Sequence, residues 1–380
     1  MRRMKEKKKK TDFWDGTLVV IAAVMILFFG IGTFLLPQER FSEHENRALS
    51  VWEAPSWKTL FHGRFSDTVG SAVRDQFPMR EALVGLKARC EQILGKRENN
   101  RIFFGENGYL MARNEYIDLS TARENLRAVE NFTETSEIPV TRIWIPRSAD
   151  VMTQYLPAPY PPNAAERLYQ MSEETLLPWL QEAAEAGCQV YYRTDHHLTT
   201  EGAYLLYCHL GETLGYEPKE RDFFTRQTVS EDFFGSADST VGGIAPRADT
   251  IELYRYDGDA HFLVADGETG EVREGLYEWS ALEKKDQYGI FLGGNFAHLS
   301  VSDPTSSDKP RLLLIKDSFA NALAPFLAIH FDLEIIDLRY TSSEIFLEEC
   351  DRALILEGVD TLATDPSLGK IEFIKQKEKG

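Results

Sequence analysis

The chain has 380 residues and a formal net charge of −18, from 60 acidic against 42 basic residues. This acidity disfavours non-specific binding to nucleic acid or to anionic lipid by the folded part. The four cysteines have no CxxC spacing, which argues against a zinc ribbon or a disulfide scaffold. Both a Cys188–Cys208 pair in an oxidising compartment and four free, buried thiols fit the sequence.

The N-terminal segment predicts a membrane anchor. Residues 1–10 carry seven basic residues against the single acid Glu6, and residues 16–36 contain no charged residue. An apolar run of about 20 residues can span a bilayer, and the basic flank predicts a cytoplasmic N-terminus with everything after Pro37 outside the membrane. A cleaved signal peptide is the main alternative, but the run is long for one and no A-x-A-like site follows. We therefore expect a basic cytoplasmic tail at 1–15 and an uncleaved single-pass signal anchor at 16–36.

A helical stalk is expected at residues 37–98. Residues 75–80 lead into a pattern in which apolar residues recur three or four positions apart, as one face of a helix requires. The members of this pattern are Leu83, Leu86, Cys90, Ile93 and Leu94. Residues 101–110 then indicate a β-hairpin around a Gly-Glu-Asn-Gly turn.

From about residue 122 the sequence alternates between helix-like and strand-like segments, which predicts βαβ units and a parallel sheet. We expect helices at 122–135, 166–186, 201–214 and 319–330, and strands at 140–145, 189–193, 288–292, 312–315, 333–338 and 353–356. Residues 217–286 break this rhythm with β-like pieces at 251–256 and 261–265. The residues thus predict one α/β domain at 99–380 with a β-rich insertion at about 217–286.

Two of the predicted strands end at reactive side chains. The strand at 189–193 leads to Asp195, His196 and His197, and the apolar run at 311–315 ends just before Ser318. Ligands of open α/β sheets bind outside the carboxyl ends of the strands. A serine at a sharp strand-to-helix turn exposes its hydroxyl near free N–H groups that can stabilise an oxyanion.

A Ser–His–Asp site follows from this pairing. Serine is a weak nucleophile near neutral pH, so Ser318 needs a base such as His197, which in turn needs a carboxylate such as Asp195. Taken singly, such a serine is usually only a helix N-cap and an Asp-His pair only a turn. Their joint occurrence at two strand ends favours a catalytic site.

Three further residues are weaker candidates for the same site. Gly294 and Asn295 could donate to an oxyanion, or could form a plain turn. Arg339 could bind an anionic or oxygen-rich substrate, or could pair with a neighbouring carboxylate. A metal held by Asp195, His196 and His197 would need a second cluster of ligands, which the sequence does not offer. We therefore predict neither a metal nor a cofactor.

Residues 195–204, which open on Asp195, His196, His197 and Leu198, resemble the signature of the DHHW family. These are bacterial exported proteins similar to the alginate O-acetyltransferases of the SGNH-hydrolase superfamily. The resemblance extends, in order, to residues 41–47, 75–78, 233–236, 291–295, 316–321 and 337–340. It implies a flavodoxin-like SGNH fold in which Asp195 and His197 form the Asp-x-His motif and Ser318 is the nucleophile. His196 takes the unconstrained middle position, and Leu198 stands where the family has Trp.

The resemblance also implies a function. The related enzymes transfer acetyl groups to exopolysaccharide outside the cell, often with a membrane-bound O-acyltransferase as the acetyl source. We expect a membrane-anchored, extracytoplasmic serine acyltransferase with a polysaccharide acceptor and a lipid contact through 16–36, and no nucleic-acid partner. Two alternatives stay open: a carbohydrate acetylesterase, which shares the acyl-enzyme, and a non-catalytic polysaccharide-binding or assembly protein, which the loss of Trp at Leu198 suggests.

Overall fold

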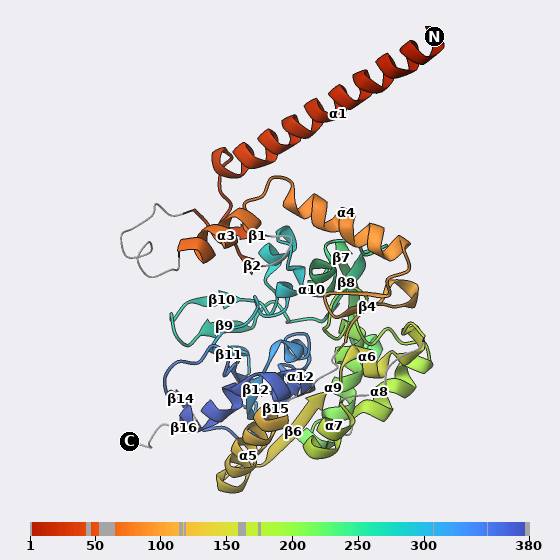
Figure 1. Ribbon diagram of the computed structural model, residues 1–380. Helices are drawn as coiled ribbons and strands as arrows, with labels where there is room; N and C mark the ends of the chain where they lie inside the picture. The colour runs from red at the N-terminus through yellow and green to blue at the C-terminus, as the bar shows by residue number, and fades with distance from the viewer. Residues whose placement is uncertain are drawn as a thin grey trace. The chain divides into compact units, whose positions relative to one another are not determined.

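The computed structural model describes residues 2–42, 47–52, 65–113, 117, 119–158, 165–173, 176–306, 308–347 and 349–376 (Figure 1). The chain divides into two compact units, Met1–Glu91 and Gln92–Gly380. Residues 43–46 of the resemblance segment 41–47 and residues 53–64 of the expected stalk lie outside the described residues.

The first unit contains the apolar helix predicted at the N-terminus. Helix α1 (Arg2–Leu35) includes Gly16–Leu35, which is long and apolar enough to cross a membrane, as a membrane anchor or a signal sequence would be. Among the described residues, the other elements of this part of the chain are β1 (Phe41–Ser42), β2 (Arg47–Ala48), α3 (Phe65–Asp75) and α4 (Arg80–Ile93). Arg47 pairs with Asp75 at 2.7 Å, and this hydrogen-bonded pair lowers the pKa of Asp75 to about 2.

The second unit is built on a mixed sheet with the strand order β10-β9-β11-β13-β12-β15-β6. The last four strands in this order run parallel: β13 (Asp332–Ile336), β12 (Arg311–Lys316), β15 (Arg352–Gly358) and β6 (Val140–Ile145). The first three continue the sheet through antiparallel pairs: β11 (His298–Ser302) pairs with β13, β9 (Leu263–Asp266) with β11, and β10 (Val272–Glu274) with β9. The protein is therefore a mixed α/β fold, and the purely parallel sheet expected from the sequence is wrong at this edge.

Strand β12 shows why the sheet is buried on both faces. Leu312 and Leu314 join one apolar cluster with residues of α8 (Leu176–Glu185), α9 (Thr200–Leu214) and α11 (Ala324–Leu327). Leu313 and Ile315 join a second cluster with residues of α5 (Leu119–Thr135), α7 (Glu166–Ser172) and α12 (Val359–Thr364). A continuous apolar run is what a parallel strand covered by helices on both sides requires.

The remaining elements surround this sheet. The hairpin predicted at 101–110 is confirmed as β4 (Ile102–Phe104) and β5 (Leu110–Ala112), with β3 (Glu98–Asn99) beside β4. Strand β7 (Thr225–Phe233) pairs with β8 (Asp249–Arg255), and β14 (Ile345–Leu347) with β16 (Ile374–Gln376). Short helices are α6 (Ser148–Val151) and α10 (Ser236–Val241), and 3-10 turns are η1 (Glu106–Gly108), η2 (Thr153–Tyr155), η3 (Arg221–Phe223), η4 (Trp279–Glu283), η5 (Gln287–Ile290), η6 (Ser318–Ala320) and η7 (Pro366–Phe373).

Two predicted strands are wrong. Residues 189–193 form a tight loop in which Tyr191 makes an isolated bridge to Leu198 and the Thr199 N–H donates to the Val190 carbonyl at 2.9 Å. Residues 288–292 begin as the turn η5, and Leu292 has a φ of 62°, which an extended strand does not allow.

Two predicted helices are broken. The segment 319–330 contains only η6 and the short α11, since Pro325, which lacks an N–H, suits only the first turn of a helix. The segment 166–186 divides into α7 and α8 after Glu173, whose φ is 54°. Strand β9, inside the predicted insertion, belongs to the main sheet. The limits of the stalk and of the insertion stay predictions.

Candidate active site

The loop before α9 is held in a fixed shape by the residues that follow it. Thr199 caps α9, since its hydroxyl accepts a hydrogen bond from the Gly202 N–H at 3.0 Å. A Cβ at Gly202 would lie 2.3 Å from the Val190 carbonyl oxygen, so only glycine allows this close packing. The N–H groups of Arg193 and Thr194 donate to the buried carboxylate of Asp249 at 2.9 and 2.7 Å. The loop therefore presents its next residues in one defined arrangement.

The structure brings Asp195, His197 and Ser318 together. His197 Nε2 lies 2.8 Å from Ser318 Oγ, and His197 Nδ1 lies 2.5 Å from Asp195 Oδ1. Asp195 and His197 are both buried. This order of contacts is the one in which a histidine takes the proton of a nucleophilic serine while a carboxylate orients the ring.

Ser236 completes the surroundings of Asp195. The N–H and the hydroxyl of Ser236 donate to Asp195 Oδ2 at 2.7 and 2.8 Å, and the His197 N–H donates to Oδ1 at 3.0 Å. Burial alone would raise the pKa of Asp195, but His197, His196 and these hydrogen bonds hold it well below its usual range. A Cβ at Gly235 would lie 2.3 Å from the Cβ of Asp195, so glycine is required before Ser236. Asp195 is therefore an ionised carboxylate in a closely fitted setting.

Tyr288 packs against one face of the His197 imidazole ring and so positions it. The rings of Tyr288 and His197 stack at 3.9 Å between centroids with an interplanar angle of 6°. The Tyr288 hydroxyl donates to the Ser318 carbonyl at 3.2 Å. Tyr288 therefore contacts both the base and the backbone of the nucleophile.

Sequence reasoning missed the roles of Ser236 and Tyr288. The sequence points to residues 233–236 only through the family resemblance, and it predicts a strand at Tyr288. Ser236 reaches Asp195 through the return of the chain after β7, which no local pattern announces.

Ser318 opens the turn that follows β12. Asp317 accepts from the Phe319 N–H at 2.9 Å, from the Gly358 N–H at 2.8 Å and from the Thr361 hydroxyl at 2.7 Å. A Cβ at Gly358 would lie 2.6 Å from the ring of Phe319. Asp317 thus ties the serine turn to the end of the neighbouring parallel strand β15.

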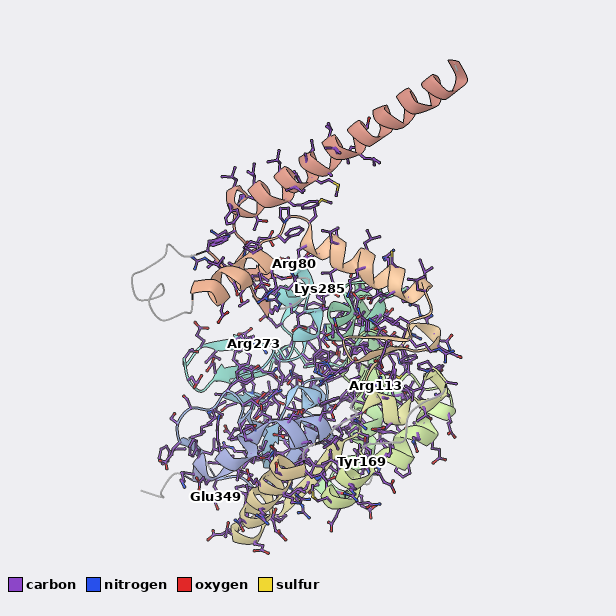
Figure 2. All side chains as sticks on the ribbon, viewed as in Figure 1. Arg80, Arg113, Tyr169, Arg273, Lys285 and Glu349 are labelled. Carbon is purple, nitrogen blue, oxygen red and sulfur yellow. The ribbon has the colours of Figure 1, made fainter. Side chains whose placement is uncertain are left out.

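Ser318 lines a cavity of about 340 Å³, large enough for a small ligand or part of a polymer. Its polar lining includes His196, Ser236, Arg147 and Arg339. Arg147 bonds Asp150 at 2.7 Å, and Asp150 also accepts from Tyr169, which is labelled in Figure 2. Apolar side chains such as Ile102, Leu110 and Val359 complete the wall. The cavity therefore offers oxygen-binding cations beside an apolar surface.

The three weaker candidates have different positions. Arg339 bonds both oxygens of Asp337 at 2.9 and 2.7 Å, which is the pairing with a neighbouring carboxylate. It also lines the cavity, and its role toward a substrate stays a prediction. Gly294 and Asn295 do not line this cavity. The amide oxygen of Asn295 accepts from Lys316 at 2.9 Å. The oxyanion role of Gly294 and Asn295 stays a prediction.

Lys316, two residues before Ser318, is a buried cation. Its Nζ donates to Asn321 Oδ1 at 2.7 Å and to Asn295 Oδ1 at 2.9 Å, and lies 3.6 Å from Asp337 Oδ2. Burial lowers the pKa of Lys316 to about 8, against the opposing effect of Asp337. Lys316 thus connects the serine turn to the carboxylate that holds Arg339.

The arrangement does not favour a metal at Asp195, His196 and His197, although their ligand atoms lie within 4.8 Å of one another. Both ring nitrogens of His197 are engaged by Asp195 and Ser318, and His196 Nδ1 lies 2.8 Å from Ser236 Oγ. A metal would have to displace these contacts.

Leu198, where the family has Trp, is fully buried. It packs within the core cluster that contains α9 and β12. A residue at this position therefore contributes to packing and exposes no surface to a sugar. Nearby, Cys188 and Cys208 are free, half-buried thiols.

One family model matches the part of the chain that holds these residues. Residues 182–336 match the model of the DHHW protein family. The resemblance noted in the sequence is thereby confirmed, and the matched DHHW segment contains Asp195, His197 and Ser318. A search of curated proteins finds no match.

Solved structures share the fold. A DHHW family protein from Eubacterium siraeum DSM 15702 is 18% identical, with a TM-score of 0.56 over 74% of this chain and 98% of that one. Bacillus cereus PatB1, solved with a sulfonyl adduct, is also 18% identical, with a TM-score of 0.56 over 71% of this chain and 97% of its own. At these identities the likeness establishes a common fold.

Proposed function

We propose that this protein is a membrane-anchored serine acyltransferase that moves an acetyl group to a polysaccharide hydroxyl through an acyl-Ser318 intermediate. The observation that carries the proposal is the chain of contacts from Ser318 Oγ through His197 to Asp195 at the wall of a cavity. The acetyl group and the polysaccharide acceptor rest on the resemblance to the alginate O-acetyltransferases. The same resemblance supports a flavodoxin-like SGNH arrangement of the parallel strands.

The proposed reaction has two steps. Ser318 Oγ attacks the acyl carbonyl, His197 takes the hydroxyl proton and returns it to the leaving group, and an acyl-serine ester forms. An acceptor hydroxyl then attacks this ester, gives its proton to His197, and leaves as the acetylated sugar while Ser318 regains the proton. Asp195 stabilises the imidazolium in both steps. Arg339, which lines the cavity, is the proposed partner for the acceptor or the developing oxyanion.

We place the catalytic unit outside the membrane, with residues 1–15 in the cytoplasm and 16–36 spanning the bilayer. The basic residues of the tail and the apolar helix Gly16–Leu35 support this orientation. On that side of the membrane a membrane-bound O-acyltransferase is the proposed source of acetyl groups.

The non-catalytic alternative loses its main support from the environment of Leu198. Its motive was the missing Trp, but Leu198 is buried in the core and the triad contacts are formed without it. The esterase alternative differs only in the acceptor, since water can attack the same acyl-serine.

The test uses the full-length protein in detergent with a chromogenic acetyl ester. Wild type and the control Ser342→Ala, a serine on an exposed loop, are expected to turn over the ester, whereas Ser318→Ala is expected to lose turnover. Addition of neutral and uronic-acid oligosaccharides then separates transferase from esterase, because mass spectrometry detects acetylated sugar only in the first case. Equal turnover by wild type and Ser318→Ala would contradict the proposal.

A further inference from the structure

Helix α4 exposes an apolar stripe. Met79, just before the helix, and Leu83, Leu86, Cys90 and Ile93 follow one another at intervals of four, three, four and three residues. Their exposure is high: 62% for Met79, 59% for Leu86 and 84% for Ile93. At 3.6 residues per turn these positions share one side of the helix, in a stripe about 100° wide. On the opposite side, Ala88 is buried.

Basic residues flank this stripe. Lys87 and Arg89 are exposed and project on either side of it, about 80° from its centre at 100° per residue. Arg80, labelled in Figure 2, stands at the start of the helix on the same side as Lys87. The acid Glu81 projects on the far side of the helix, where it accepts from the Ser42 hydroxyl at 2.6 Å. Lys87 also lies 3.4 Å from the acid Glu91, one turn further along the helix. The exposed face of α4 is therefore apolar at its centre and has a basic residue along each edge.

The start of α4 lies against the end of the apolar span. Phe77 stacks on Phe29 of α1, with ring centroids 5.0 Å apart and an interplanar angle of 7°. A Cβ at Gly32 would lie 2.9 Å from Pro78, so these two residues are also in close contact. Phe29 lies six residues before Leu35, the end of the span, or about 9 Å along the helix axis. If α1 crosses a bilayer, the contacts of Phe77 and Pro78 lie within about 9 Å of the outer end of the span. Helix α4 then begins near the boundary between the hydrocarbon region and the headgroups.

Hydrogen bonds of Asp75 and Gln76 hold the turn between α3 and α4 in place. The Gln76 amide bonds to the backbone of Glu39 and Ser50, with its Nε2 donating at 2.8 and 2.9 Å. Asp75 accepts from Arg47 and from the Ser50 N–H. These contacts fix the direction in which α4 leaves the end of α1.

We infer that α4 lies in the plane of the membrane on anionic lipid, with its apolar stripe in the headgroup boundary and Lys87 and Arg89 beside the phosphates. Helices with an apolar face flanked by lysine and arginine bind bilayers in this way. The inference rests on α1 as a membrane span and goes beyond the proposed chemistry. A second copy of the chain fits less well, because Lys87 and Arg89 would meet no acidic residue across a parallel pair of α4 helices.

The test uses the full chain reconstituted in vesicles of phosphatidylcholine and phosphatidylglycerol. Single cysteines carry an environment-sensitive fluorophore in a variant with Cys90, Cys188, Cys208 and Cys350 changed to alanine. Leu86→Cys reports on the stripe, Gln92→Cys on the polar side, and Ile26→Cys on the span. Spin-labelled lipids are expected to quench the probes at 26 and 86 at least twofold more than the probe at 92. The double change Lys87→Glu and Arg89→Glu, or omission of phosphatidylglycerol, is expected to reduce quenching at 86 and not at 26.

The inference would be overturned if the probe at 26 is strongly quenched but the probes at 86 and 92 are quenched equally. It would also be overturned if the probe at 26 is not quenched. Cross-linking between two copies through residue 86 would overturn it in favour of a dimer seam. Ester turnover by the same vesicles tests the proposed function separately, since α4 contributes no residue to the cavity at Ser318. A variant that fails to insert is replaced by Leu83→Cys, whose side chain lies on the same stripe.

Discussion

Ser236 donates two hydrogen bonds to one oxygen of Asp195, from its N–H at 2.7 Å and its hydroxyl at 2.8 Å, and leaves the other oxygen to His197. Because Ser236 holds one carboxylate oxygen and His197 bonds the other, the orientation of the imidazole ring is fixed. Because the contact joins residues 41 positions apart, it depends on the fold as a whole.

Removal of the Ser236 hydroxyl should slow the reaction. One hydrogen bond to a charged group contributes about 1.5–3 kcal/mol, so Ser236→Ala should reduce kcat by about ten- to a hundredfold, with KM little changed. Asp195→Asn should cost about 10⁴-fold, because it favours the wrong tautomer of the histidine. Steady-state turnover of a chromogenic ester measures both. Unchanged kcat in Ser236→Ala would show that the hydroxyl does not position Asp195.

Gly235 should not tolerate a larger residue. A Cβ there would lie 2.3 Å from the Asp195 side chain, so Gly235→Ala should shift the loop and destabilise the protein by about 1–3 kcal/mol. Gly369→Ala is the matched control, because nothing lies within 4 Å of the added methyl group. Thermal unfolding of the two variants should therefore differ, and equal melting temperatures would contradict the close fit.

Substitutions of Leu198 should affect stability in the way that substitutions of a core residue do. Leu198→Trp adds volume at a fully buried position and should destabilise the fold by about 1–3 kcal/mol, whereas Leu198→Met should cost less than about 1.5 kcal/mol. Neither change should improve acceptor binding. A Leu198→Trp variant with unaltered stability and tighter oligosaccharide binding would instead indicate a sugar-contacting position.

Because of Lys316, the free energy of unfolding should depend on pH in the alkaline range. Its folded pKa of about 8 lies below the ordinary value of 10.5, so between these values the unfolded chain binds the extra proton. The free energy of unfolding of wild type, relative to Lys316→Met, should therefore rise as pH increases from 8 to 10.5. Denaturant unfolding at both ends of this window measures the difference. A difference that stays constant or falls would show that Lys316 keeps its proton.

The sequence predicted which side chains come together better than it predicted the elements that carry them. Ser318 was placed correctly because β12 is a continuous apolar run whose end is visible in the residues. Asp195 and His197 were found by their chemistry, although the strand expected before them is a loop held by Thr199 and Asp249. Tyr288 could not be found, since it stacks on His197 only through the turn η5, where an apolar segment suggested a strand.

Ser318 is proposed as the nucleophile that carries the acyl group. The most direct measurement is treatment of the full-length protein with a sulfonyl fluoride, followed by mass spectrometry of the peptides, since sulfonyl reagents modify activated serines. A single adduct is expected on Ser318 in wild type and in Ser342→Ala, with loss of ester turnover in proportion to labelling, and none in Ser318→Ala or His197→Ala. An adduct on another residue, or full turnover after Ser318 is modified, would contradict the account.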